Sequence, residues 1–460
     1  MKEYDVVIIG SGAGANLVMD ALSHDKTVAL VDKGPLGGTC LNVGCIPTKL
    51  IVFPADRVME IREAAKLGIA AEVKGIDFPG IMERMRSSVL QSRKRIRESI
   101  ESNSDQFDFY EGEAYFSGER TLKVADAEIR GKTVFIASGA RPLIPQLKGL
   151  ESVEYLTNET ALQLTELPES MIIAGGGYIA VEFAHFFEAM GAKVTIIQKN
   201  ARLVPDEEPE ISAQLLKALS RRMTIHLSAE AVEVRQTGKV VTVTAREQGS
   251  NKVIEHTAHS LLIAAGRRSN ADVLMVKNTG VKTDESGYIS VDPFFETSQK
   301  DIWAIGDAIG KKMFRHTANH EAELVWHNAV HGKKSRMNFL TVPHAVFTWP
   351  EIASVGLTEE EAVKAIGRDQ VLVGKAMYTD VARGQAMLET EGFTKAVVHR
   401  KTGKILGYHI IGPQASILIQ EVVNAMASDG NIWSVAKGIH IHPALSEVVL
   451  KAFGKLEEQE

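Results

Sequence analysis

A glycine-rich turn between a short apolar strand and a helix occurs twice in this chain, and this repeat constrains the fold more than any other feature. The first copy has an apolar strand at residues 4–10, the turn Gly10-Ser11-Gly12-Ala13-Gly14-Ala15, a helix to about Ser23, and a second strand at 27–31 that ends in Asp32. In such a unit the glycines let the backbone approach a pyrophosphate, the helix N-terminus offers free N–H groups, and the acid accepts hydrogen bonds from a ribose. The pattern therefore predicts a dinucleotide site.

The second copy has a strand at residues 171–174, the turn Gly175-Gly176-Gly177-Tyr178-Ile179-Ala180, a helix at 181–190, and a strand at 194–197 that is followed by Gln198. Two dinucleotide sites in one chain indicate two bound nucleotides, one of which passes electrons to the other.

Composition and charge narrow the class of protein. The 460 residues exceed what a single core usually supports, so several domains are expected. A content of 45% hydrophobic and 24% charged residues is that of an ordinary globular protein, and a net charge of -6 argues against a nucleic-acid binder. One basic stretch at helical spacing predicts the solvated face of an amphipathic helix. It comprises Arg84, Arg86, Arg93, Lys94, Arg95 and Arg97.

The N-terminus leads directly into an apolar strand without a small-residue cleavage site, so no signal peptide is expected. No stretch approaches the roughly 20 apolar residues that span a bilayer. We therefore expect a soluble, cytoplasmic protein with no nucleic-acid or membrane partner.

Two further apolar strands, at residues 134–139 and 261–266, each end at a glycine and are expected to mark where the chain crosses between domains. Alternation at residues 240–244 predicts antiparallel strands. The last part of the chain mixes short strands and helices without a nucleotide fingerprint, and it includes a capping box at Thr358 to Glu361. This α+β part is expected to serve assembly or substrate binding.

The chain has only two cysteines, Cys40 and Cys45, in the segment Gly37-Gly38-Thr39-Cys40-Leu41-Asn42-Val43-Gly44-Cys45-Ile46-Pro47-Thr48-Lys49. In a regular helix their Cα atoms would lie at least about 7.5 Å apart, too far for a disulfide. The glycines and Pro47 permit a distorted entry into a helix that begins near Pro47. A pair at a helix start has a catalytic profile. Structural thiols or half of a metal site are the alternatives, but no further metal ligands lie nearby.

The segment 37–49 resembles the redox-active motif of the class I pyridine nucleotide-disulfide oxidoreductases, the family of glutathione reductase, dihydrolipoamide dehydrogenase, mycothione reductase and mercuric reductase. The resemblance covers essentially the whole chain. It implies an α/β fold with two Rossmann-like domains of the glutathione reductase type and a C-terminal α+β dimerisation domain. The expected divisions are 1–148 and 271–338 for FAD, 149–270 for NAD(P), and 339–460 for the subunit interface.

The resemblance also assigns catalytic roles. Cys40 matches the thiol that attacks the substrate, and Cys45 matches the thiol next to the flavin. Lys49 matches the lysine near the flavin ring, and Glu182 matches the glutamate that pairs with it.

The expected FAD contacts lie mainly in the first glycine unit, the redox segment and two later motifs, Ile305-Gly306-Asp307 and His316-Thr317-Ala318. They are Gly10, Gly12, Ala15, Asp32, Lys33, Thr39, Lys49, Gly139, Asp307 and Ala318. The expected NAD(P) contacts lie at the second turn and the strand end beyond it, and Tyr178 gates the nicotinamide pocket in some relatives. They are Gly175, Gly177, Tyr178, Ile179, Gln198, Lys199 and Gly266.

His442 in His440-Ile441-His442-Pro443-Ala444-Leu445-Ser446-Glu447 matches the family's acid-base histidine, with Glu447 as its orienting partner. A histidine held by a carboxylate suits proton transfer to a thiolate leaving group near neutral pH. His440 has no motif match and is interpreted as structural. In the family this histidine acts in the active site of the other subunit, so the resemblance implies an obligate homodimer.

The substrate is left open by the sequence. With no extra cysteine pair, direct access by a small disulfide or a lipoyl arm is favoured over relay to a bulky substrate or mercuric ion. Several segments are most similar to mycothione reductase, so we expect a low-molecular-weight disulfide reductase, with dihydrolipoamide dehydrogenase as the alternative. A flavoprotein redox sensor and an NADH oxidase are remoter alternatives.

The nucleotide could be NADPH or NADH. Gln198 stands where an NADH site would place an acid, which removes repulsion of a 2′-phosphate, and Lys199 and Arg202 follow. These residues favour NADPH.

Overall fold

The computed structural model describes residues 1–101, 105–250 and 252–458. The chain forms two compact units, each assembled from three segments. The first unit comprises Met1–Leu50, Met82–Leu143 and Gly266–Met337, and the second comprises Ile51–Ile81, Ile144–Ala265 and Asn338–Glu460. The helices α3 (Cys45–Glu63) and α4 (Phe78–Glu101) each contain a boundary between the units.

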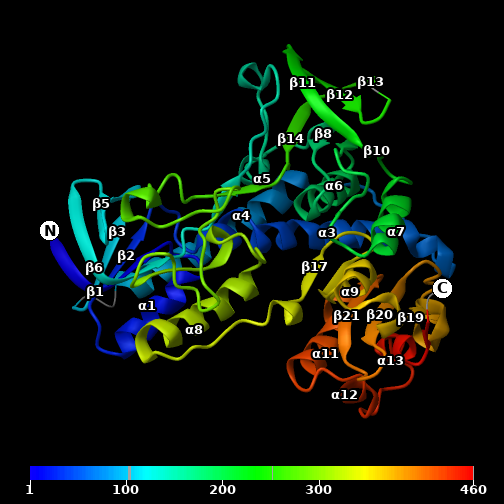
Figure 1. Ribbon diagram of the computed structural model, residues 1–460. Helices are drawn as coiled ribbons and strands as arrows, with labels where there is room; N and C mark the ends of the chain where they lie inside the picture. Colours follow the sequence, from blue (N-terminus) through cyan, green and yellow to red (C-terminus); the bar gives the residue numbers. More distant parts are fainter. Residues whose placement is uncertain (102–104, 251, 459–460) are drawn as a thin grey trace. The chain divides into compact units, whose positions relative to one another are not determined.

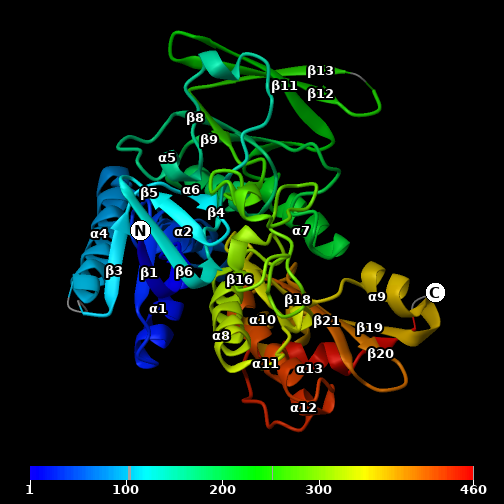
Figure 2. The same cartoon turned by 60° about the vertical axis from the view of Figure 1, so that its left-hand side comes forward.

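The first unit is built around a seven-stranded sheet with the order β3-β2-β1-β6-β5-β4, in which β16 also pairs with β6 (Figures 1 and 2). Strands β3, β2, β1, β6 and β16 are parallel, while β5 and β4 continue antiparallel. The bounds are β1 Lys2–Ile9, β2 Val28–Asp32, β3 Phe107–Glu111, β4 Ala114–Gly118, β5 Thr121–Val124, β6 Ala127–Ile136 and β16 Ile302–Ala304. Strand β2 and the carboxyl-terminal halves of β1 and β6 are apolar and mostly buried, as is typical of parallel strands covered on both faces.

Parallel pairing brings the carboxyl ends of β1, β2, β6 and β16 to one edge of this sheet, where open α/β sheets bind ligands. Helix α1 (Gly14–Ser23) leaves β1 at this edge and packs beside α8 (Arg315–His331). The short helix α2 (Gly38–Asn42) follows β2, so the redox segment also begins at this edge.

The second unit contains a parallel sheet with the order β10-β9-β8-β14 and an antiparallel meander of β11, β12 and β13. The bounds are α5 Asn158–Ala161, β8 Ser170–Ala174, α6 Tyr178–Met190, β9 Lys193–Ile197, α7 Pro209–Leu219, β10 Thr224–His226, β11 Ala229–Thr237, β12 Val240–Glu247, β13 Val253–Ala258 and β14 Ser260–Ile263. Buried residues of the sheet and the meander share one core.

The C-terminal part of the second unit is a six-stranded sheet with the order β17-β18-β21-β20-β19-β22, antiparallel throughout and packed against helices. The bounds are β17 His344–Val346, β18 Ile352–Gly356, α9 Glu359–Ile366, β19 Val371–Met377, α10 Ala382–Ala386, β20 Phe393–His399, β21 Ile405–Ile411, α11 Ala415–Ala427, α12 Trp433–Ala436, α13 Glu447–Phe453 and β22 Leu456–Glu457. Thr358 caps α9 with both hydrogen bonds of the predicted capping box.

The strands and helices of both glycine units lie where the sequence predicts them, and residues 240–244 lie in the antiparallel meander. Three boundaries differ. Strands β6 and β14 end before they reach Gly139 and Gly266, and α3 begins at Cys45 rather than near Pro47. After the two glycines, β7 (Ala140–Pro142) and β15 (Arg267–Ser269) pair antiparallel, close in sequence to two of the points where the chain passes between the units.

One helical stretch, residues 38–67, reaches by length and hydropathy alone the level expected of a membrane span, which the sequence analysis did not anticipate. Its apolar residues include Ile51, Val52, Ala55 and Met59, which belong to the second unit and are buried. Only part of the helix is buried, so one apolar face packs against the protein.

Candidate active site

The two glycine turns have the same geometry. Gly10 has a φ of +106°, and a Cβ on it would lie 2.3 Å from the Ala137 carbonyl oxygen. Gly175 has a φ of +130°, and its Cβ would lie 2.1 Å from the Ala264 carbonyl oxygen. In each copy the strand beside the turn therefore approaches too closely for any side chain, which explains why both turns begin with glycine.

The first turn fits the pyrophosphate and ribose of FAD. The Asp32 carboxylate accepts hydrogen bonds from the Ser11 N–H at 2.5 Å and the Gly34 N–H at 2.8 Å, so it is fixed at the end of β2. Two polar atoms near the carboxyl ends of the sheet are buried without a hydrogen-bond partner, Ser138 Oγ and Thr317 Oγ1. Buried polar atoms are ordinarily satisfied, so these two fit the polar groups of a bound dinucleotide.

The buried Glu321 and the half-buried Asp307 carboxyl groups both belong to the surroundings of the motif Ile305-Gly306-Asp307. Burial raises the pKa of Asp307, against the effect of the nearby Arg267 guanidinium. Burial also raises the pKa of Glu321 to about 7, although its carboxylate accepts a 2.6 Å hydrogen bond from the Gly306 N–H. Glu321 lies on α8, one turn beyond Thr317 and Ala318, and so joins this motif to the helix that was expected to touch the flavin ring.

The redox segment is broken where the sequence predicted distortion. Helix α2 ends at Asn42, α3 begins at Cys45, and the turn between them brings the two cysteine side chains within hydrogen-bonding reach. Both are free thiols in this structure. A Cβ on Gly44 would lie 2.9 Å from the Thr39 carbonyl oxygen, so only glycine permits the break to be this tight.

Cys40 is the cysteine with the more acidic thiol. A hydrogen bond from Cys45 lowers the pKa of Cys40 to about 7, with further lowering from the Arg315 guanidinium and the N–H groups of Cys45 and Ile46. Burial opposes this effect. The hydrogen bond to Cys40, together with burial, raises the pKa of Cys45 well above its usual range. The two amides belong to the first turn of α3, so the helix N-terminus stabilises the Cys40 thiolate.

Two arginines that the sequence analysis did not assign to the site contact it. Arg315, at the start of α8, lies beside Gly12, where its Nη1 would be 3.8 Å from a Cβ. Arg93 of α4 donates to the Asn42 side chain, whose amide donates in turn to the carbonyls of Pro35, Leu36 and Gly38. Arg315 directly precedes the predicted His316-Thr317-Ala318 motif, which is the one signal in the sequence that could have drawn attention to it.

Gln198 directly follows β9 and lies beside the second glycine turn. Its side chain is buried against Gly176, and its amide donates to the Arg202 carbonyl at 3.2 Å. Lys199 is exposed and Arg202 is half-buried. The chain that follows β9 beside this turn therefore carries an amide and two cations instead of a carboxylate.

His442 and Glu447 form the predicted pair. His442 Nδ1 lies 2.9 Å from Glu447 Oε1, while Glu447 Oε2 accepts from the Ala444 N–H at 3.1 Å. With Nδ1 directed at the carboxylate, Nε2 is free to exchange protons. The His442 side chain is 72% exposed, and next to it Ile439 is fully exposed. His440 instead contacts Glu421 on α11 at 2.7 Å, in agreement with a structural role.

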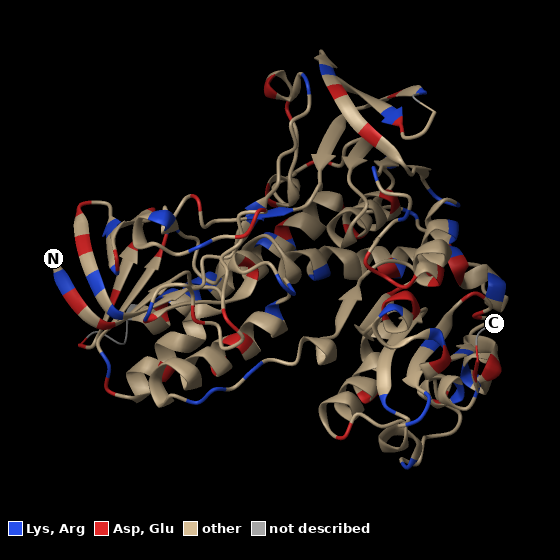
Figure 3. Cartoon of the chain, in the orientation of Figure 1, with Lys and Arg blue, Asp and Glu red and all other residues tan. Residues whose placement is uncertain are grey.

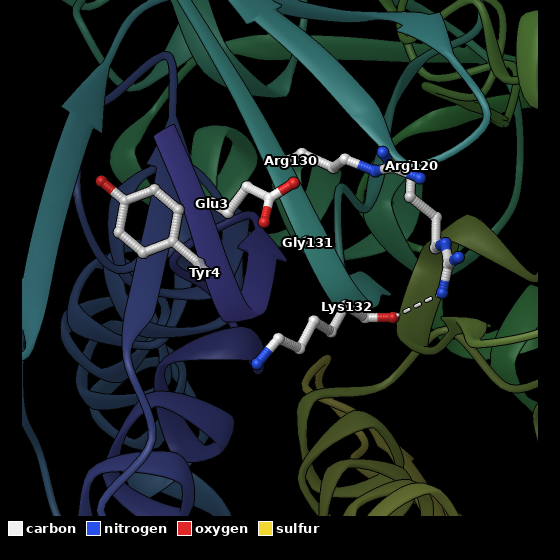
Figure 4. A pocket seen from close by; sticks show the side chains of 6 residues that line it. All are labelled: Glu3, Tyr4, Arg120, Arg130, Gly131 and Lys132. Atoms are coloured by element: carbon white, nitrogen blue, oxygen red, sulfur yellow. Dashed lines mark hydrogen bonds between the residues drawn. The ribbon is translucent and has the colours of Figure 1, made fainter. Parts of the chain in front are cut away.

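One cavity lies outside the residues that were predicted for the site. This cavity of about 150 Å³ lies beside the amino end of β1 and the middle of β6 (Figure 4), and it is lined by Glu3, Tyr4, Arg120, Arg130, Gly131 and Lys132. Basic and acidic residues are interspersed along the chain (Figure 3). On α4, Arg97 pairs with Glu111, so part of the predicted solvated face is engaged. Within residues 1–101, 105–250 and 252–458, no three His, Cys, Asp or Glu side chains are grouped to hold a metal ion.

The predicted residues fall into two groups. Cys40, Cys45, Asp32, Asp307 and the residues of α8 gather in the first unit at the carboxyl edge of its sheet. The second group, in the second unit, comprises Gly175, Tyr178, Glu182, Gln198, His442 and Glu447.

Two regions of the chain match known family models. Residues 4–329 match the family described as pyridine nucleotide-disulphide oxidoreductase, and residues 342–453 match the dimerisation domain of the same family. Mycothione reductase of Mycobacterium tuberculosis is 36% identical over 465 residues, covering 98% of this chain and 99% of that protein. Dihydrolipoyl dehydrogenase of Geobacillus stearothermophilus is 33% identical, covering 98% and 95%. The solved structure of the HOCl-induced flavoprotein disulfide reductase RclA from Escherichia coli has a TM-score of 0.85 at 29% identity, covering 98% and 99%.

Proposed function

Because the chain belongs to the pyridine nucleotide-disulphide oxidoreductase family, we propose that it reduces a low-molecular-weight disulfide through Cys40 and Cys45. It is an FAD-dependent enzyme that acts on sulfur groups and uses NAD(P)H, as its relatives do. The single observation that carries the proposal is the break between α2 and α3, which places the Cys40 thiolate at a helix N-terminus in contact with the Cys45 thiol.

FAD would be held by the first glycine turn, Asp32, Asp307 and the start of α8, next to the redox segment. Bound there, it supplies two-electron exchange between the nicotinamide and the cysteine pair. Lys49 and, from the second unit, Glu182 are proposed to lie beside its ring.

The cysteines carry the substrate chemistry. The Cys40 thiolate attacks one sulfur of the substrate disulfide, forms a mixed disulfide and releases the first product as a thiolate. The Cys45 thiol then loses its proton and its sulfur attacks the Cys40 sulfur, which releases the second product as a thiolate that takes up a proton and leaves a Cys40–Cys45 disulfide. Two electrons from the nicotinamide nucleotide restore the dithiol. The low pKa of Cys40 favours it as the attacking thiol because thiolate, not thiol, is the nucleophile.

His442 is proposed to donate a proton from Nε2 to the departing thiolate while Glu447 holds Nδ1. An exposed histidine beside fully exposed Ile439 and mostly exposed Ile441 fits a surface that a second subunit covers. The dimerisation domain supports a homodimer, and we propose that each His442 serves the cysteines of the partner subunit.

NADPH is the proposed nucleotide. The buried Gln198 amide cannot repel a 2′-phosphate, and Lys199 and Arg202 offer positive charge beside it. The proposed division of the chain remains 1–148 and 271–338 for FAD, 149–270 for NADPH and 339–460 for the interface. A cytoplasmic location is proposed with it.

Two relatives define the substrate question. Similarity to mycothione reductase at 36% identity supports a small thiol disulfide, and similarity to dihydrolipoyl dehydrogenase at 33% supports a lipoyl group as the second candidate.

Anaerobic reduction tests both. Purified FAD-loaded enzyme is mixed with NADPH or NADH, the flavin and thiolate charge-transfer absorption are recorded, and oxidised mycothiol, glutathione or lipoamide is then added. We expect a long-wavelength band that NADPH generates and oxidised mycothiol discharges. Discharge by lipoamide alone would support the second candidate. A reduced flavin without the band, or undiminished turnover in Cys40→Ser, would sink the dithiol mechanism.

A further inference from the structure

A buried cluster in the second unit joins the nucleotide loop to the C-terminal sheet, and the chemistry above makes no use of it. The loop begins at Gln198 and ends at Glu207 and Glu208, just before α7. Both glutamates are nearly inaccessible to solvent, 4% and 2% exposed. Burial of a carboxylate is costly in free energy, so a buried carboxylate is ordinarily paired and hydrogen-bonded.

Glu207 is held by two residues that face each other across neighbouring strands. His344 of β17 and Ser354 of β18 are directly paired in the ladder, so their side chains lie on one face of the sheet. His344 Nε2 lies 2.6 Å from Glu207 Oε1, and Ser354 Oγ donates to Glu207 Oε2 at 2.6 Å. Both oxygens are therefore occupied, and β17 and the loop are fixed together.

The same strand leads to Glu182. Directly after β17, the Phe347 N–H donates a 3.0 Å hydrogen bond to the Glu182 carboxylate. Glu182 is 4% exposed and lies on α6. The position of this peptide depends on β17, and β17 is held through His344.

Glu207 is also connected, through Val204, to the second glycine turn. The Glu207 N–H donates to the Val204 carbonyl at 2.9 Å, and the Val204 N–H donates to the Gly176 carbonyl at 2.7 Å. Val204 has a φ of +40°, a conformation that a β-branched residue adopts only when its surroundings enforce it. A continuous route of contacts therefore leads from the nucleotide turn back to α6, the helix that begins at this turn. The route passes through Gly176, Val204, Glu207, His344, Phe347 and Glu182. Figure 1 labels α6 and β17.

We propose that His344 is a positioning residue for hydride transfer, which acts by holding Glu207 and thereby fixing the peptide that orients Glu182. The inference rests on the proposed function, in which Glu182 lies beside the flavin with Lys49. His344 itself contacts neither nucleotide nor flavin in this scheme.

A double-mutant cycle tests the inference. Stopped-flow flavin reduction at saturating NADPH is measured for wild type, His344→Ala, Glu182→Gln and the double variant. We expect His344→Ala to slow reduction about tenfold, because small displacements of a reacting group are costly. In the Glu182→Gln background the same substitution should change the rate by less than about twofold, because residues that act through one another are not additive.

Two further variants separate positioning from loss of structure. His344→Gln keeps an N–H donor near the Nε2 position and should restore most of the rate, whereas the shorter His344→Asn should not. If His344→Ala does not fold, the Gln and Asn pair carries the comparison. Lys375→Met is the control for a general loosening of α7 against the C-terminal sheet, since Lys375 joins them through Glu210 and not through Glu207 or His344.

The outcomes are distinct. Equal slowing by His344→Ala in both backgrounds, or no slowing in a folded variant, overturns the positioning role while leaving the proposed function intact. Failure of both NADPH and NADH to reduce the wild-type flavin defeats the proposed function itself.

Discussion

At the scale of single residues, the acidity of Cys40 has three sources that point to one atom. The Cys45 thiol donates to it, two amides of the α3 N-terminus face it, and the Arg315 guanidinium adds positive charge. Of these, the charge can be removed without disturbing the backbone of the redox segment.

Arg315→Met should therefore raise the pKa of Cys40. In the reduced wild-type enzyme, alkylation by iodoacetamide should rise with pH through a midpoint of about 7, since a lowered pKa keeps the thiolate populated above that pH. In the variant the midpoint should move to higher pH, and alkylation at pH 7 should slow by roughly twofold to fivefold, the scale of one partly screened charge.

Arg315→Lys keeps the charge and serves as the control, with a midpoint near that of wild type. An unchanged midpoint in Arg315→Met would assign the whole effect to the Cys45 thiol and the helix amides. Mass spectrometry of the alkylated peptide identifies which cysteine reacts.

At the scale of elements, the sequence predicted the features that depend on residues close together in the chain. The strand, turn and helix units at Gly10 and Gly175 follow from glycine spacing and apolar runs, and so do the meander at residues 240–244 and the break near Gly44. The Arg315, Glu207 and His344 contacts could not be predicted, because each joins residues that are distant in sequence and carries no motif. They became visible only when the fold placed α8 beside the redox segment and β17 beside the end of the nucleotide loop.

Gly44 is the element-scale test of the redox geometry. In Gly44→Ala the new methyl group would meet the Thr39 carbonyl at 2.9 Å, so the α2 to α3 junction must open. We expect a loss of about 1–3 kcal/mol in the free energy of unfolding, as for other overpacked sites. The Cys40 thiol should also become less acidic, since its hydrogen bond from Cys45 is stretched.

Chemical denaturation and the alkylation profile measure the two effects. Gly75→Ala is the matched control because a Cβ there meets nothing within 4 Å. A wild-type alkylation profile in Gly44→Ala would contradict the view that this junction sets the cysteine separation.

Lys395 tests the anchoring of α7 to the C-terminal sheet. Its ammonium group is buried among the carboxylates of Glu208, Glu210 and Glu359, at 2.7, 2.8 and 2.8 Å. Lys395→Met leaves Glu208 buried without its cation and should cost about 3–5 kcal/mol of unfolding free energy. Lys217→Met, which removes a more exposed pair with Glu391, should cost less than about 1 kcal/mol. Equal losses in both variants, measured by denaturant titration, would refute a special role for burial.

At the scale of the whole molecule, the residues of the proposed chemistry are divided between the two units. The nucleophile lies in the first unit, and the acid-base histidine lies on an exposed, apolar part of the second. Large exposed isoleucines such as Ile439 and Ile441 are typical of a subunit interface. If the site is shared between subunits, two different inactive subunits can together form one working site, which is impossible if each site lies within one subunit.

Subunit complementation therefore decides the arrangement. Cys40→Ser and His442→Gln homodimers should each be nearly inactive in disulfide reduction. Co-expression with two different affinity tags, followed by tandem purification, yields the heterodimer. If His442 serves the partner's cysteines, one site of the heterodimer combines two mutated residues and the other combines the wild-type Cys40 with the wild-type His442. The heterodimer should then show about half of wild-type activity, one working site of two. If each site were complete within one subunit, every site in the heterodimer would lack one of the two residues, and activity would stay at the level of the homodimeric variants.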